Sequence, residues 1–184
     1  MKTKSQLSLL LSLLIFSLLF ATFVSAEQEL SDKEQQTVNI GLYVLNIGKF
    51  DVTAGTYTID FYLSMKCDTE CDPSKFEFAN GRATSTDKII DEKDEKFYRI
   101  QAQLANNMDL RKFPFDRQTL TIELEDKVNT KESIVYAVDN SSTGIDERVI
   151  FAGWRIDNYE ATVEDHNYPV YGEIYSKYNF KLNI

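Results

Sequence analysis

Residues 106–125 read NNMDLRKFPFDRQTLTIELE, and the pattern in this stretch decides the fold that we expect. Its second half alternates strictly between apolar and polar side chains, with Leu120, Ile122 and Leu124 on one face. An alternation of period two is typical of a half-buried β-strand. The turn before it contains Phe-Pro-Phe at 113–115, whereas an ordinary surface turn favours Gly, Asn, Asp and Ser. We therefore predict a strand, a turn and a second strand, with an apolar turn that contacts another surface.

Similar alternation recurs along the chain after residue 37. A tyrosine-rich reversal is expected at 168–175, and the charged segment 84–96 is expected to lie in solvent. Roughly eight to ten short strands without a long amphipathic helix predict one all-β domain, a sandwich or a barrel. The predicted strands cover 38–47 (with a bulge where the apolar phase slips at Leu45), 55–63, 76–78, 98–104, 134–138, 149–163 (long, with a bulge near Asp157) and 178–184.

The N-terminus carries an export pattern. Two lysines precede an uncharged apolar run that ends in Val-Ser-Ala before Glu27. This arrangement predicts a secretory signal peptide over 1–26, followed by a polar lead-in over 27–36. The apolar run is longer than usual for such a segment, so an uncleaved membrane anchor is the alternative. The domain at 37–184 is therefore expected outside the cytoplasm, in an extracellular or periplasmic location.

The overall charge excludes one class of partner. The chain has 184 residues and a formal net charge of −9, and no basic stretch is visible. Nucleic-acid binding needs a basic face, so no nucleic-acid partner is expected. An acidic balance favours cationic ligands or metal ions, although it also serves ordinary solubility.

The two cysteines, Cys67 and Cys71, are separated by three residues in CDTEC. They could form a local disulfide, bind a metal or remain free. Two cysteines fall short of the four ligands of a structural zinc site, and an export signal permits disulfides, so the disulfide ranks first. Neither a metal site nor a cofactor is expected.

Signatures of catalysis are missing from the sequence. His166 is the single histidine, and its polar surroundings predict an exposed loop residue. No Gly-x-Ser-x-Gly nucleophile motif and no glycine-rich phosphate loop occurs. An enzyme is therefore not expected.

The segment 168–175 holds the most distinctive set of side chains, Tyr168, Tyr171, Tyr175 and Glu173. Tyrosine rings beside a carboxylate can hold an ammonium group through cation–π contacts worth about 0.5–2 kcal/mol per ring. The alternative is a tyrosine-rich hairpin that packs on the sheet. Trp154, a lone tryptophan on an apolar strand face, is expected in the core.

The segment 109–118, DLRKFPFDRQ, resembles the signature loop of the Cys-loop receptor superfamily, the pentameric ligand-gated ion channels. The two cysteines that bracket this loop in the family fall here on Asn106 and Leu120, as in prokaryotic-type members without the disulfide. Segments 38–63, 76–80, 153–156 and 178–182 resemble family strands in the same order. The resemblance implies that the loop couples ligand binding to a pore through Asp109, Arg111, Phe113, Pro114, Phe115 and Asp116.

The resemblance also implies a fold and a site. The fold would be an immunoglobulin-like twisted β-sandwich of about ten strands, assembled as a ring of five copies with ligand sites between neighbours. Two aromatic positions of the family's ligand site differ here, because one falls in the segment 65–68 and the other near Lys127. The ligand-binding residues would be Tyr168, Tyr175, Glu173, Asn80 and Tyr171.

The implied function is that of an extracellular domain at the cell membrane. It would bind a small ligand, with cations among the candidates, and gate a membrane pore domain missing from this chain. The alternative is a stand-alone secreted ligand-binding protein of the same fold. A third reading, an unrelated secreted β-sandwich for adhesion or catalysis, does not account for the signature loop.

Overall fold

The computed structural model describes residues 35–184 except 70, 109 and 112–116. Within these residues, ten strands and no membrane-spanning helix are found, which confirms the predicted all-β sandwich. The predicted signal peptide and most of the lead-in lie outside the described residues. The strands are β1 (Gln36–Asp51), β2 (Thr56–Cys67), β3 (Phe76–Phe78), β4 (Gly81–Asp91), β5 (Glu95–Ala105), β6 (Thr119–Asp126), β7 (Ile134–Val138), β8 (Gly144–Ile145), β9 (Asn158–Tyr168) and β10 (Glu173–Asn183).

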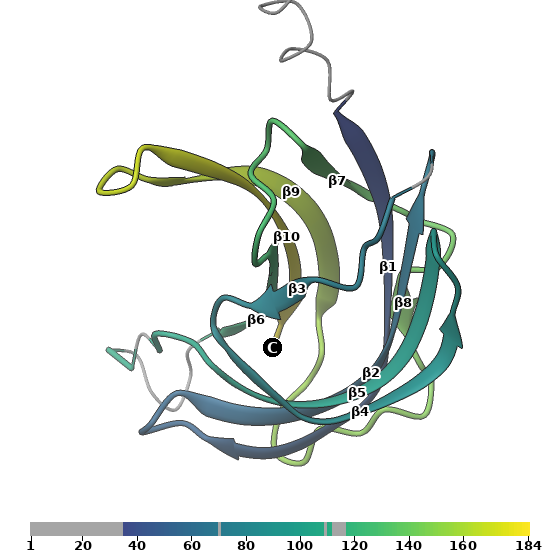
Figure 1. The fold of residues 1–184 in the computed structure, drawn as a ribbon. Coiled ribbons are helices and arrows are strands. Elements are labelled where there is room, and N and C mark those ends of the chain that lie inside the picture. The colour runs from purple at the N-terminus through teal and green to yellow at the C-terminus, as the bar shows by residue number, and fades with distance from the viewer. Residues whose placement is uncertain (1–34, 70, 109, 112–116) are drawn as a thin grey trace, which may run out of the picture. The chain divides into compact units, whose positions relative to one another are not determined.

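The strands form two sheets that face each other (Figure 1). The larger sheet has the order β4-β5-β2-β1-β7, with β8 also paired to β1. The smaller sheet has the order β3-β6-β10-β9. Most neighbours are antiparallel, whereas β7 and β8 each run parallel to β1.

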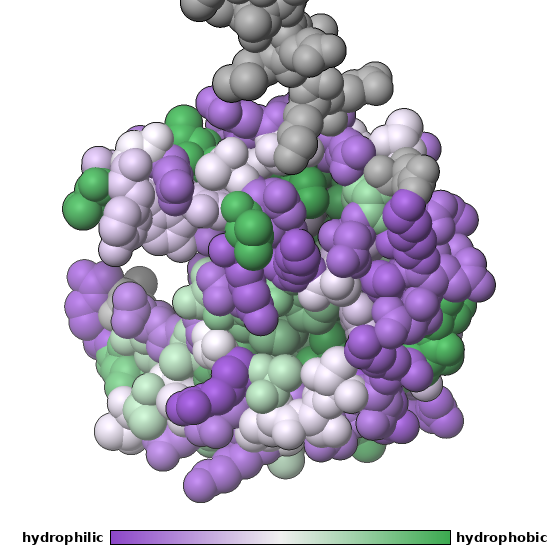
Figure 2. Space-filling view, viewed as in Figure 1, coloured by the Kyte–Doolittle hydropathy of each residue, from purple (hydrophilic) through white to green (hydrophobic). Residues whose placement is uncertain are grey.

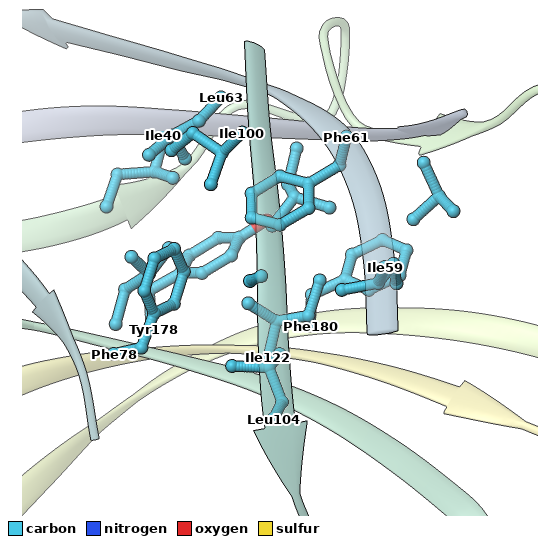
Figure 3. Close-up of a cluster of buried hydrophobic side chains, with 14 of the residues drawn as sticks. Ile40, Ile59, Phe61, Leu63, Phe78, Ile100, Leu104, Ile122, Tyr178 and Phe180 are labelled. Carbon is cyan, nitrogen blue, oxygen red and sulfur yellow. The ribbon is translucent and has the colours of Figure 1, made fainter. Parts of the chain in front are cut away.

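The core lies between the sheets because alternate side chains of each strand point inward. Tyr57, Ile59, Phe61 and Leu63 of β2 are all buried, as the alternation at 55–63 predicts. Figure 3 shows Phe61 among side chains of the facing sheet, including Phe180 of β10. Full burial of side chains of this size contributes about 1.5–3 kcal/mol each, so this layer dominates the stability of the fold.

The predicted bulge in the first strand is confirmed. The pairing of β1 with β2 shifts its register between Val44 and Asn46, next to the point where the apolar phase slips. One extra residue in a strand reverses the faces of all residues that follow. The bulge is therefore visible in the sequence as a change in the phase of the apolar alternation.

Two segments differ from their predicted structure. Segment 84–96 is mostly exposed as expected, although Lys96 is buried, and most of it forms β4, an edge strand whose side chains show no alternation because neither face is covered. The long strand predicted at 149–163 is wrong for 149–157, since β9 begins only at Asn158. Gly153 has a φ of 85°, which lies outside the β region and breaks the strand. Trp154 is only half-buried there, and its ring centroid lies 5.4 Å from that of Phe50.

The stretch 106–125 connects the two sheets. β5 belongs to the larger sheet and β6 to the smaller one, so the segment between them is a crossover. The Asn106 side chain accepts a hydrogen bond from the Thr121 backbone N–H at 3.1 Å, which ties the start of the crossover to β6. The apolar turn 113–116 lies outside the described residues.

The polar face of β6 is more buried than a half-buried strand predicts. Thr121 and Glu125 are 7% and 2% exposed. The Tyr57 hydroxyl reaches across from β2 and donates to the Thr121 carbonyl at 2.6 Å. Side chains of β9 cover Glu125, as described below.

A disulfide joins Cys67, at the end of β2, to Cys71. Both cysteines are buried at the edge of the core, and their Cα atoms lie 5.9 Å apart. The bridge closes the small loop that leads from β2 toward β3.

Candidate functional site

The hairpin of β9 and β10 extends beyond the strand next to it. The two strands pair from Asn158↔Asn183 to Tyr168↔Glu173, whereas β10 pairs with β6 only as far as Tyr178↔Leu124. Figure 1 shows the yellow end of the hairpin extending away from β6. The predicted reversal at 168–175 is therefore present, and its outer part overhangs the sheet.

The turn of this hairpin has a simple local cause. The backbone N–H groups of Tyr171 and Gly172 both donate to the Tyr168 carbonyl at 3.0 Å. Gly172 has a φ of 68°, which glycine adopts without the steric cost that a side chain imposes. This turn places Tyr168 and Tyr175 on paired strands close to each other.

A cavity of about 230 Å³ lies under the overhanging hairpin. Its volume is below the range of about 300–1,000 Å³ typical of drug-sized ligands, so a smaller molecule fits. Four of the five ligand-binding residues implied by the resemblance line it. The lining residues are Glu77, Glu125, Asp126, Lys127, Tyr168, Tyr171, Glu173 and Tyr175.

Two tyrosine rings of this cavity lie against each other. The Tyr168 and Tyr175 centroids lie 5.6 Å apart with planes at 87°, edge to face. The Tyr175 hydroxyl donates to Glu173 at 2.9 Å. Because four carboxyl groups and one ammonium group line the walls, the cavity combines aromatic faces with negative charge, which favours a small cationic ligand.

Glu125 is the buried carboxylate of this wall. The Tyr168 hydroxyl donates to its Oε2 at 2.9 Å, and His166 Nδ1 contacts its Oε1. The His166 ring also lies over Tyr168, with centroids 4.3 Å apart. A buried carboxylate is costly without such partners, so these contacts allow Glu125 to remain inside the site.

The hydroxyl groups of the site are held in their neutral form. Burial, and then the hydrogen bond to Glu125, raises the pKa of Tyr168 to about 12. The hydrogen bond to Glu173 is the main cause that raises the pKa of Tyr175. Both groups are therefore protonated donors at physiological pH, and their rings remain neutral faces for a cation.

The Tyr168 hydroxyl gives a test of this geometry. We expect Tyr168 to ionise near pH 12 and the Glu125→Gln variant to ionise at lower pH, because the carboxylate no longer opposes the phenolate. Since the folded pKa lies above the ordinary 10.0, the associated stability is present below pH 10 and lost as the pH rises toward 12. NMR of ¹³Cζ-labelled tyrosine measures this, with Tyr168→Phe to assign the signal. An unchanged midpoint in Glu125→Gln would contradict the hydrogen bond.

Asn80 has a different environment from the other implied ligand residues and does not line the cavity. Its amide nitrogen donates to the carbonyls of Thr121 and Ala105, and its amide oxygen accepts from the Glu123 N–H at 3.2 Å. The side chain thus joins β6 to the end of β5. Of the implied coupling residues, Arg111 lies in a turn, while Asp109, Phe113, Pro114, Phe115 and Asp116 lie outside the described residues.

Three residues of the site were missed by sequence reasoning. The expectation that His166 is an exposed loop residue is wrong, because it lies on β9 and is half-buried against Glu125. Glu125 and Glu77 are direct cross-strand partners of β6 and β3, a relation that only the register shows. Among the described residues, no group of three or more acidic, histidine or cysteine side chains is arranged to hold a metal.

The comparisons with known proteins point to a channel. No protein-family model matches the chain. A proton-gated ion channel of Gloeobacter violaceus is 26% identical over 177 residues, which cover 82% of this chain and 49% of the channel. The chain thus spans about half the length of this relative. This similarity supports a distant relation between the present chain and an ion channel rather than an enzyme.

Proposed function

We propose that residues 37–184 form the extracellular ligand-binding domain of a pentameric ligand-gated ion channel. The observation that carries this proposal is the similarity to the Gloeobacter channel across 82% of the chain. The signature-like loop at 109–118 and the two-sheet fold agree with it. Residues 1–26 would direct export, and the pore would be formed outside residues 37–184.

The proposed ligand is a small cation held in the cavity under the hairpin. Tyr168, Tyr171 and Tyr175 supply aromatic faces, and Glu173 and Glu125 supply negative charge. Closure of the overhanging hairpin on the ligand would favour one of two conformations of the domain, and the loop at 109–118 would transmit this preference to the pore.

The tip of the hairpin supports assembly with further copies. Val170 and Tyr171 are 90% and 75% exposed, and Ile174 is 42% exposed. Figure 2 shows apolar side chains on the surface at this end of the molecule. Clustered apolar side chains on a surface mark interaction sites, and a neighbouring copy in a ring would cover them.

A chimera tests the proposal. Residues 1–184 would be joined to the part of the Gloeobacter channel that the match leaves uncovered and expressed in oocytes. We expect currents when small amines are applied; acid is applied in parallel because the relative is named for gating by protons. Surface expression without any current would contradict the channel proposal. Ligand binding by such a silent chimera would instead favour the stand-alone binding protein.

A further inference from the structure

The overhanging end of the β9–β10 hairpin is held to β6 by side chains. Main-chain pairing between β10 and β6 stops at Tyr178↔Leu124, one residue before Glu125. From there, Glu125 contacts His166 and Tyr168 of β9, across the hairpin. The Lys131 backbone N–H also donates to the Ile174 carbonyl at 2.8 Å, so the hairpin has a second support that does not depend on charge.

The two members of the charged contact differ in their access to solvent. The Glu125 side chain is 3% exposed, whereas the His166 side chain is 35% exposed. Both oxygens of Glu125 already have partners, one on His166 and one on Tyr168. A proton that arrives from solvent between neutral and mildly acidic pH therefore has His166 as its entry point, since histidine is the side chain that ordinarily titrates in this range.

Several other charged groups surround this pair on every neighbouring element. Lys177 is shared between Glu123 at 3.5 Å and Glu164 at 3.1 Å, and Lys131 pairs with Asp165 at 2.5 Å, so these cations already have carboxylate partners. The buried Tyr136 of β7 has its pKa raised, first by burial and then by the charges of Asp126, Glu125 and Glu77. The titratable groups around His166 and Glu125 come from both strands of the hairpin, from β6 and the residue that follows it, and from β3. They are Glu164, Tyr168, Glu173, Tyr175, Lys177, Glu123, Asp126, Lys127 and Glu77.

We propose that His166 and Glu125 make cation binding in the tyrosine cavity proton-dependent. Glu125 is at once a wall of the cavity and the partner of His166. A proton on His166 adds one positive charge directly against this wall carboxylate and reduces its attraction for a bound cation. Protons and the cation therefore oppose each other at this site. This inference rests on the proposed function, because it takes the cavity as the ligand site.

The coupling must act in both directions. If protonation of His166 weakens cation binding, a bound cation weakens proton binding by the same factor. Coupling between two sites typically changes an affinity by a factor of about 5–150. Because His166 is partly exposed to solvent, we expect the change in cation affinity to lie near the lower end, at about five-fold.

The single histidine of the chain makes the test direct. In the untagged 184-residue protein, one imidazole signal in the NMR spectrum belongs to His166. Tetramethylammonium serves as the probe cation and is titrated by calorimetry at about pH 5.5 and about pH 7.5, on either side of the ordinary histidine range. We expect about five-fold weaker binding at the lower pH and a shift of the imidazole midpoint to lower pH when the cation is bound.

Two variants separate the coupling from the folded state. His166→Gln removes the titrating group at a half-exposed position and is expected to bind with the same affinity at both pH values. Glu125→Gln removes the carboxylate that both contacts His166 and lines the cavity, and its affinity is expected to depend less on pH than that of the wild type.

Each result has a defined meaning. Equal affinity of the wild-type protein at both pH values overturns the coupling while leaving the cavity as a ligand site. A pH dependence that persists in His166→Gln overturns the role of His166. Absence of any cation binding overturns both the cavity as a cation site and the coupling, whereas the channel assignment is then judged from the chimera alone.

Discussion

The Tyr175→Ala variant is expected to bind tetramethylammonium about five-fold more weakly than the wild-type protein. Tyr175 is only partly buried, so its contact with a cation is weaker than one in a desolvated site. Tyr175 lies edge to face against Tyr168, so its removal also leaves the remaining ring without its neighbour. Calorimetric titration measures the change, and light scattering on the same sample reports whether the assembly state is preserved.

Two matched variants make this result specific. Tyr175→Phe retains the ring and loses only the hydroxyl that donates to Glu173, so its affinity is expected to remain within about three-fold of the wild type. Tyr62→Ala removes a tyrosine of the opposite sheet, where it stacks on Phe97 at 5.2 Å, and should leave binding unchanged. If Tyr175→Ala binds as tightly as the wild type, the tyrosine cavity is not the cation site.

The Asn80→Ala variant is expected to lower the free energy of unfolding by about 2–4 kcal/mol. Its amide makes hydrogen bonds to three backbone groups, of Thr121, Ala105 and Glu123, at the junction of β5 and β6. Net contributions of about 1 kcal/mol per hydrogen bond, summed over these three bonds, give this range. Urea unfolding followed by circular dichroism measures the difference.

This variant also distinguishes a structural role for Asn80 from a ligand-binding one. Asn46 is exposed on β1, and Asn46→Ala is expected to change stability by less than about 0.5 kcal/mol. At a temperature where Asn80→Ala is still folded, its affinity for tetramethylammonium should equal that of the wild type. If Asn80→Ala is as stable as the wild type but no longer binds tetramethylammonium, Asn80 is a ligand-binding residue and its structural role is contradicted.

The predictable part of the fold is the part in which burial is one-sided. In β2, every second residue faces the core, so the alternation of Tyr57, Ile59, Phe61 and Leu63 reports the strand directly. The sequence of the edge strand β4 shows no such alternation, because its side chains are exposed on both faces. Segment 149–157 has apolar residues at strand-like spacing, but they pack as an irregular loop around Trp154.

The predictable part of the site is the part that is local in sequence. Tyr168, Tyr171, Glu173 and Tyr175 lie within one tight turn and its flanking pairs, so their grouping follows from the hairpin alone. Asn80 belongs to a different part of the fold, and its three hydrogen bonds depend on the crossover between the sheets. No local pattern distinguishes it from a residue that faces a ligand.

The sequence by itself determined the all-β class, the phase of most strands, the bulge in β1 and the tyrosine hairpin. Each of these depends on a repeat or a turn within a few neighbouring residues. Only the tertiary structure decided that Glu125 is buried and that His166 and Tyr168 hold it. The reason is physical: these contacts join strands some forty residues apart, and their register is fixed by the packing of two sheets. The pattern in residues 106–125 thus predicted a strand, whereas the packing of the two sheets placed Glu125 in a candidate binding site.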